Sequence, residues 1–470
     1  MSGSPSRIAV IGAGITGLSA AHEAAVAGGD RVEVTLFDGS GRAGGLIKTS
    51  TFAGLRVDEG ADAFLRRVPE ALTLARSVGL DERLTSPTAG TAAVWVDGLR
   101  RLPEGLVLGV PTSTISLARS RLVSPVGAAR ALADLVLPRR ALDHDSIGAW
   151  VRGRLGEEVH DRLTDALVGS IYAADTDRFS LAAVPQLDAL ARGGRSAILT
   201  ALRQRRPSDS GPVFAAPSDG MGSLADAVLT AAVAAGAMTR LEAPVEAVEA
   251  GGGGVLIDGE RFEAAILATP ARVSARLLAS SAPAAAAGLG SIETAGVVMV
   301  TLAIPGDSLP EACSGLSGYL VPKSRQRRVT AVSFASNKWS HLRPADGSQI
   351  LRVSLGRDGM DISDLDDGEV VDSVVSEVSD HLGAQLAPNE VRVTRWPSSF
   401  PQYRPHHGAL VATIERSLPA TIVAAGASLH GIGVPACVGS GRRAAQSVLS
   451  RLGIDGHRPE PVPDCFGDGR

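Results

Sequence analysis

The first forty residues alternate between buried-strand and helix patterns. An apolar run at Arg7–Ile11 leads into the turn GAGITG, and an alanine-rich stretch with helical spacing continues from Leu18 to about Ala27. A second apolar run, Val32–Phe37, ends at Asp38. This pattern predicts a strand, a turn, a helix and a second strand, which is the repeating unit of parallel α/β sheets.

The middle of the chain changes pattern twice. Residues from about 111 to 206 have helix-like apolar spacing and predict a mostly helical region, which ends at the linker-like PSDSGP of 207–212. A glycine turn feeding a helix follows, then two strands around Gly251–Gly254 and a buried strand at Ala264–Thr269. The four glycines predict a plain hairpin turn, because no helix N-terminus follows that could hold an anion.

The last third of the chain predicts strands with few helices. Residues 294–396 mix strands with one helix at Glu369–Leu382. A strand at Thr421–Ala425 comes next, then a glycine-rich turn up to Gly441 and a helix from Arg442 to Leu452. The tail from residue 456 is rich in proline and aspartate, and we expect it to be disordered.

Composition excludes several functional classes. Lysine and arginine total 46 against 50 acidic residues, a net charge of −4, so no overall attraction draws the chain to nucleic acid or anionic lipid. The three cysteines form no CxxC pair, which argues against both a disulfide framework and a structural zinc site. No signal peptide or membrane-spanning stretch is evident, and we expect a cytoplasmic protein.

The turn after the first strand carries the spacing Gly12-x-Gly14-x-x-Gly17. The first glycine permits a tight turn, the second lets a pyrophosphate approach the backbone, and the third lets the helix pack closely. Asp38 ends the next strand, 21 residues after Gly17, where a carboxylate accepts hydrogen bonds from ribose hydroxyls and disfavours a 2′-phosphate. The turn therefore predicts a bound dinucleotide.

The residues after Asp38 separate FAD from a nicotinamide cofactor. The run Gly41-Arg42-Ala43-Gly44-Gly45 stands where a dehydrogenase would enter its next helix, and its backbone and arginine can reach the same pyrophosphate from the other side. The chain has no second GxGxxG unit. These features predict a single dinucleotide, whose electrons leave to an acceptor other than NAD(P)⁺.

Several segments resemble known flavoproteins. IAVIGAGITGLSAAHEAA, LFDGSGRAGGLI, VDEGADAFL and GASLHGIGVPACVGSGRRAAQSV resemble the FAD-binding signatures of the amine-oxidase-like superfamily. Four further segments resemble one family within it, the protoporphyrinogen/coproporphyrinogen oxidases. They are IYAADTDRFSL (Ile171–Leu181), PVFAAPSDGMGSLADAV (Pro212–Val228), FPQY (Phe400–Tyr403) and GIGVPACVGSG (Gly431–Gly441). The resemblance runs from about Arg7 to Leu452.

The resemblance implies an α/β fold. It consists of a Rossmann-type FAD-binding domain of the amine-oxidase kind, a mixed-sheet substrate domain and an inserted helical subdomain. We expect the FAD-binding domain at 1–86, 207–280 and 408–455, the substrate domain at 87–106 and 281–407, the helical subdomain at 107–206, and the disordered tail at 456–470.

The resemblance also implies which residues contact FAD. The turn after the first strand and Asp38 hold the ADP half, the next glycine turn follows it, and residues 60–63 pass along the flavin. Val245, in the strand before the four glycines, bonds adenine, and the last helix begins at the flavin O2 end. The implied residues are Gly12, Ala13, Gly14, Ile15, Thr16, Gly17, Asp38, Gly39, Arg42, Leu46, Gly60, Ala61, Asp62, Ala63, Val245, Trp396, Ile432, Gly433 and Val434.

The family reaction is a six-electron oxidation of a porphyrinogen to a porphyrin in heme biosynthesis. A bridging methylene gives a hydride to the flavin in each of three steps, and dioxygen removes the electrons as hydrogen peroxide. Arg66, Arg67 and Tyr172 are candidate substrate contacts, with surface arginines and a core tyrosine as the alternative interpretations. We assign no catalytic acid or base and no metal ligand.

The sequence leaves alternatives open for the substrate and for the class of protein. Arginines interrupt the helical region of 107–136, which indicates at most peripheral membrane contact. The composition, rich in alanine, glycine and arginine and poor in lysine, resembles that of bacterial proteins, and the resemblance to the soluble bacterial branch of the family then implies coproporphyrinogen III rather than protoporphyrinogen IX. An amine oxidase or a carotenoid desaturase of the same superfamily is the next candidate. A non-catalytic escort protein of the same fold is the candidate from another class. The pathway also suggests a hand-off of the product to a heme-pathway chelatase.

Overall fold

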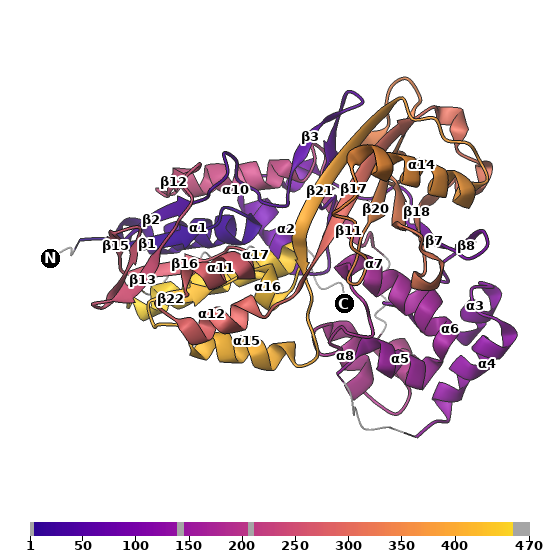
Figure 1. The fold of residues 1–470 in the computed structure, drawn as a ribbon, viewed down its shortest axis with the longest axis horizontal. Coiled ribbons are helices and arrows are strands. Elements are labelled where there is room, and N and C mark those ends of the chain that lie inside the picture. The colour runs from indigo at the N-terminus through magenta and orange to yellow at the C-terminus, as the bar shows by residue number, and fades with distance from the viewer. Residues whose placement is uncertain (1–3, 139–144, 205–210, 455–470) are drawn as a thin grey trace, which may run out of the picture.

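The computed structural model describes residues 4–138, 145–204 and 211–454. The tail for which disorder is expected lies outside these ranges. Figure 1 shows three parts: a parallel sheet with its helices at the end near the N-terminus, a second sheet, and a helical region.

A five-stranded parallel sheet forms the first part, in the order β12-β2-β1-β16-β22. Its strands are β1 (Ser6–Ile11), β2 (Val32–Phe37), β12 (Met238–Arg240), β16 (Ala264–Leu267) and β22 (Ile422–Ala424). The chain enters this sheet from three stretches that are far apart in the sequence. The predicted strand–turn–helix–strand unit is confirmed, with the helix α1 (Ile15–Gly28) beginning three residues earlier than expected.

Both faces of this sheet are covered. Ile8, Val10 and Ile266 face a core made with α1, α2 (Pro69–Ser77), α10 (Gly222–Ala234) and α17 (Val434–Arg451). The alternate residues face a second core, made with α11 (Ala271–Leu277), α12 (Pro283–Gly290), α15 (His407–Arg416) and the small sheet of β13 (Val248–Gly251), β14 (Gly254–Ile257) and β15 (Glu260–Phe262). Burial on both faces explains the nearly continuous apolar runs of these strands.

Of two predictions about glycine-rich segments, one is confirmed and one is wrong. The four-glycine hairpin is confirmed, because Gly251 pairs with Gly254 while Gly252 and Gly253 take positive φ angles of 58° and 74°. The glycine turn predicted up to Gly441 is wrong, since α17 already begins at Val434. Its proline lies in the first turn, where a missing N–H is harmless, and Gly441 lies against α1.

The second sheet has seven strands in the order β21-β17-β20-β19-β18-β7-β8. Only the β18–β7 pair is parallel within this described sheet. The helix α14 (Asp367–Leu382) packs Val370, Val374 and Val378 against it and begins with a capping box of Asp366 and Glu369. The strands are β7 (Thr91–Trp95), β8 (Leu99–Arg101), β17 (Thr294–Ile304), β18 (Leu316–Leu320), β19 (Val329–Phe334), β20 (Gln349–Leu355) and β21 (Glu390–Pro401).

The predicted helical region is confirmed and has a core of its own. Its elements are α3 (Thr114–Arg119), α4 (Pro125–Leu132), α5 (Ile147–Leu155), α6 (Glu157–Val159), a π-helix (His160–Gly169), α7 (Ser170–Tyr172), α8 (Pro185–Arg192) and α9 (Ala197–Gln204). A buried, bidentate pair fastens the region to the second sheet: Arg357 donates to both oxygens of Asp165 at 2.9 Å.

Shorter elements lie between these longer ones along the chain. They are β3 (Thr49–Phe52), β4 (Leu55–Asp58), β5 (Phe64–Leu65), β6 (Leu84–Thr85), β9 (Leu106–Val107), β10 (Val110–Pro111), β11 (Phe214–Pro217), α13 (Ala335–Lys338) and α16 (Ala427–His430). The division of the chain into domains at the expected residues stays a prediction. Among the helices that the structure describes, none has the length and apolar character that crossing a membrane requires.

The buried carboxylate of Asp58 yields a prediction about stability. It accepts the N–H of Met221 at 2.9 Å, next to the start of α10, and burial raises its pKa to about 6. A raised pKa means that the folded protein binds a proton that the unfolded chain has already released, so stability falls as pH rises from about 4 to about 6. At pH 7.5 this opposes folding by about 3 kcal/mol at most.

Asp58→Asn keeps an oxygen for the Met221 N–H and removes the titration. We expect its melting temperature to exceed that of the wild type more at pH 7.5 than at pH 5, measured by thermal unfolding of both proteins at each pH. A difference that does not change between the two pH values would contradict the raised pKa.

Candidate functional site

The three glycines of the first turn do different jobs. Gly12 has a φ of +103°, and a Cβ there would lie 2.8 Å from the carbonyl oxygen of Ala268. A Cβ on Gly17 would lie 1.8 Å from the carbonyl oxygen of Gly12. The fold itself therefore requires these two glycines.

Gly14 differs from both, because none of the described atoms lies within 4 Å of where its Cβ would be. It is the N-cap of α1, where no described side chain caps the helix and the first turn holds no acidic residue. The first N–H groups of the helix and the positive end of its dipole thus face open space beside a bare backbone. This arrangement fits the pyrophosphate of a dinucleotide.

Asp38 lies beside this turn. Its Oδ2 accepts the Ala13 N–H at 2.6 Å, and its Oδ1 accepts the backbone N–H and hydroxyl of Ser40 at 2.8 and 2.6 Å. An ionised carboxylate has about four acceptor positions. One remains for a ribose hydroxyl, so the predicted role fits the geometry.

Arg42 is bound within its own loop. Its guanidinium donates to the carbonyl oxygens of Ala43 and Ile47 at 3.1 and 3.0 Å, and also to that of Gly45. These bonds fold the glycine loop, and the Gly44 N–H then donates to the Ala13 carbonyl at 2.8 Å. The structure thus shows Arg42 as the support of the loop that lies against the first turn.

The predicted contacts continue from this loop to the second sheet. The Cβ position of Gly45 is 3.1 Å from Gly14 Cα, and that of Gly60 is 2.2 Å from the Leu46 carbonyl oxygen. Trp396 lies next, 3.6 Å from the Gly60 Cβ position, and its Nε1 donates to the Glu59 carbonyl at 2.9 Å. Leu46 is 45% exposed although it lies among these residues. Residues from distant parts of the sequence thus form one continuous line.

The segment just before Val245 lies beside Asp38. The Ala243 N–H donates to the Asp38 carbonyl at 2.9 Å, and the Gly39 Cβ position is 3.3 Å from Pro244. Val245 itself is buried. Its expected place in a strand is wrong, because β13 begins only at Val248, and its expected bond to adenine stays a prediction.

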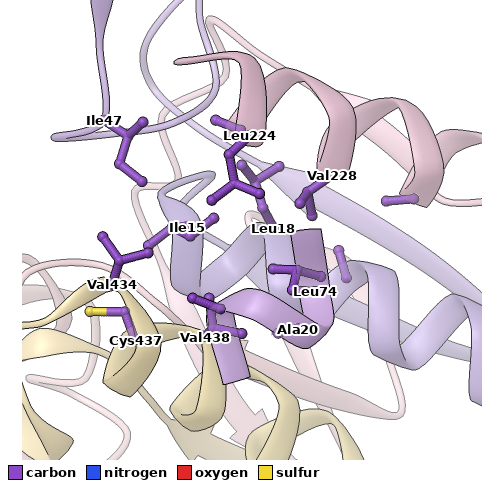
Figure 2. Close-up of a cluster of buried hydrophobic side chains, with 14 of the residues drawn as sticks. Ile15, Leu18, Ala20, Ile47, Leu74, Leu224, Val228, Val434, Cys437 and Val438 are labelled. Atoms are coloured by element: carbon purple, nitrogen blue, oxygen red, sulfur yellow. The ribbon is translucent and has the colours of Figure 1, made fainter. Parts of the chain in front are cut away.

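The start of α17 lies against the start of α1. Figure 2 shows Val434 beside Ile15 and Ile47 in one apolar cluster. Gly433 is the N-cap, with extended backbone, and Ile432 precedes it. The preceding turn is fixed by Tyr403, whose hydroxyl donates to the Ala427 carbonyl and accepts the Gly431 N–H at 2.9 Å. The sequence had placed Tyr403 in a family signature without giving it a role.

The segment at 60–63 contains a charged cluster that sequence reasoning missed. Asp62 accepts hydrogen bonds from Lys338 Nζ at 2.8 Å and Trp339 Nε1 at 3.4 Å, and it forms an ion pair with Arg352 Nη1 at 3.3 Å. Burial opposes ionisation of Asp62, but the two cations outweigh it and hold the pKa of the carboxyl below its ordinary range. The partners are more than 270 residues away, so only the fold reveals them.

The candidate substrate residues are not brought together. Arg66 donates to the Ser86 hydroxyl at 3.2 Å, and Arg67 is exposed. Tyr172 is half-buried at the end of α7, its ring centroid 5.0 Å from that of Phe179, and burial raises the pKa of its hydroxyl. Among the described residues, no hydrogen bond or ring contact joins Tyr172 to either arginine, so their roles stay predictions. Within the described ranges, no three His, Cys, Asp or Glu side chains gather as metal ligands would.

Comparisons with known proteins agree with this geometry. A family model described as flavin containing amine oxidoreductase matches residues 15–449. A coproporphyrinogen III oxidase of Mycobacterium leprae is 34% identical over 455 residues, which covers 94% of this chain and 98% of the relative. That of Bacillus subtilis is 30% identical over 477 residues, covering 96% and 100%.

A solved structure extends the likeness to three dimensions. The crystal structure of an Exiguobacterium protein, described provisionally as a protoporphyrinogen oxidase, has a TM-score of 0.82 and 25% identity. It covers 95% of this chain and 99% of its own. The likeness therefore includes both sheets and the helical region.

Gly14→Val tests where the dinucleotide lies. The Gly14 backbone is extended at φ −65° and ψ 173°, and no described atom obstructs a side chain, so the variant should fold. The branched side chain fills the space beside the helix start, and we expect loss of the dinucleotide during gel filtration.

Gly251→Val is the matched control, because its Cβ position is equally open among the described residues and it lies in β13. It should retain the cofactor. Parent-like cofactor binding by Gly14→Val would place the dinucleotide elsewhere.

Proposed function

Because the chain belongs to the flavin-containing amine oxidoreductase family, we propose that it is an FAD-dependent oxidase that converts coproporphyrinogen III to coproporphyrin III. The observation that carries the proposal is identity of 30% or more, over almost the whole chain, to two proteins named coproporphyrinogen III oxidase. The family match supports a flavin, and the turn at Gly14 with its neighbouring carboxylate supports FAD in particular.

The chain offers a separate element to each part of FAD. The start of α1 faces the pyrophosphate, Asp38 accepts from the ribose, and Val245 lies near the adenine. Residues 60–63 and Trp396 line the flavin, and the first N–H groups of α17 meet its O2 end, where a helix dipole favours negative charge. When bound, FAD takes two electrons at a time from the substrate and passes them to dioxygen.

The reaction demands positioning more than acid–base chemistry. Coproporphyrinogen III loses six electrons and six protons, and three dioxygen molecules become three molecules of hydrogen peroxide. Formation of the aromatic macrocycle supplies the driving force. The protein has to hold a bridging methylene near the flavin, where Tyr172 is the proposed contact of the macrocycle, and to neutralise the propionates, for which Arg66 and Arg67 are the proposed contacts.

A second candidate substrate is protoporphyrinogen IX, which the provisional description of the Exiguobacterium structure favours. It carries two vinyl groups where coproporphyrinogen carries two further propionates. Peripheral membrane contact, a cytoplasmic location and hand-off to a chelatase stay predictions.

We expect one FAD per chain, bound without a covalent link. Cys437 is the described cysteine nearest the flavin turn, its Sγ 3.5 Å from the Gly431 carbonyl oxygen. Burial raises the pKa of its thiol to about 11, so the thiolate that would attack a flavin is scarce at neutral pH. Acid precipitation should leave the yellow colour in the supernatant, and Cys437→Ala should bind FAD like the parent. Colour retained on the parent pellet would contradict this.

Aerobic incubation with coproporphyrinogen III should produce fluorescent coproporphyrin and about three molecules of peroxide per porphyrin, without NAD(P)⁺. Porphyrinogens also oxidise in air, so a reaction without enzyme is the control. A strong preference for protoporphyrinogen IX, compared anaerobically at equal concentration, would change the substrate. Flavin-loaded protein that accelerates neither substrate would overturn the porphyrinogen reaction.

A further inference from the structure

Three side chains of the second sheet and its connecting helix α13 form hydrogen bonds with the chain at residues 59–62. Trp396 of β21 donates to the Glu59 carbonyl, and Arg352 of β20 donates to the Gly60 carbonyl. Lys338, at the end of α13, donates to the Asp62 carboxylate at 2.8 Å. Two of these three hydrogen bonds go to backbone carbonyls, and the third goes to a charged side chain. The two hydrogen bonds to backbone carbonyls would already hold the segment in place. The ion pair between Lys338 and Asp62 therefore calls for a further explanation.

The Asp62 cluster, defined as Asp62, Lys338, Trp339 and Arg352, carries more positive than negative charge. One carboxylate faces two cations, of which the Lys338 side chain is 17% and that of Arg352 is 5% exposed. The Nε of Arg352 is buried with no acceptor among the described residues, so the carboxylate does not use all of its donors.

One neighbouring carboxylate offsets this excess in part: burial raises the pKa of Asp58, and the charge of Arg352 acts against that rise. Glu59 pairs with Lys48 at 2.8 Å, and Asp58 is turned toward Thr49 and Met221. Charges so deeply placed act in a low effective dielectric and are felt more strongly than surface charges. The positive excess therefore lies along the segment at 60–63.

We propose that Lys338, held by Asp62, is a positioning residue that sets the reduction potential of the bound flavin. This rests on the proposed function, in which residues 60–63 pass along the flavin. Reduction adds negative charge to the flavin, and a fixed cation beside it stabilises the reduced form more than the oxidised form. Asp62 keeps the lysine in place and moderates its charge.

The proposal makes opposite predictions for the two partners. Lys338→Met removes a positive charge and should lower the midpoint potential of the bound flavin. Asp62→Asn removes a negative charge and should raise it, and the double variant should lie between them. We expect each single change to alter the affinity ratio of reduced to oxidised flavin about tenfold, which is about 30 mV for a two-electron couple.

Two matched variants separate charge from shape. Lys338→Arg keeps the cation and should keep the potential. Lys323→Met removes another of the three lysines of the chain, one that also pairs with an aspartate, Asp175, at 2.7 Å but lies away from the cluster. It should leave the potential unchanged. The potentials are measured by dye-coupled titration of the flavin-loaded proteins after free FAD has been removed, so that unbound flavin does not hide a shift.

The outcomes are distinguishable. Shifts in the same direction for Lys338→Met and Asp62→Asn, or no shift in either, would overturn the proposal and leave the cluster as a structural clamp. If Lys338→Met does not fold, Lys338→Gln makes the same charge change with a polar side chain. A wild-type protein that binds no flavin would instead refute the proposed function.

Discussion

Two backbone contacts that leave no room for a methyl group hold the parallel sheet, its first turn and its last helix in one arrangement. A Cβ at Gly17 would lie 1.8 Å from the Gly12 carbonyl oxygen, and one at Gly441 would lie 2.1 Å from that of Thr16. Helix α1 is therefore held between the turn that precedes it and α17, which comes from the other end of the chain. The starts of the two helices are brought together, and no described side chain caps either of them.

The second sheet completes the site by reaching back to the first. Trp396 and Arg352 bind the carbonyls of Glu59 and Gly60, and Lys338 binds Asp62. The segment that follows β4 is thus positioned by strands more than 270 residues later. The backbone that we propose faces the cofactor is therefore held by contacts from both sheets.

Local sequence patterns predicted most helices and strands. The features that the sequence did not predict depend on contacts between residues far apart in the chain. The strand, turn and helix around Gly12–Gly17 follow from periodicity and from glycines at fixed spacing, and so does the hairpin at Gly251–Gly254. The start of α17 was missed because glycine is read as a helix breaker, whereas Gly441 serves close packing against α1. Lys338 and Arg352 gave no signal, since nothing near them in the sequence marks a partner at Asp62.

Tyr403 explains why the signatures FPQY and GIGVPACVGSG occur together: the first positions the turn that begins the second. Its hydroxyl donates to the Ala427 carbonyl and accepts the Gly431 N–H, so FPQY fixes the turn that begins GIGVPACVGSG. Burial raises the pKa of this hydroxyl, which therefore keeps the proton that it donates. Its ring stacks on His407 at 4.2 Å and lies 5.5 Å from Phe179 of the helical region. The start of α17 and the helical region therefore share contacts through Tyr403 and through Ile432, which also packs against the core of the helical region.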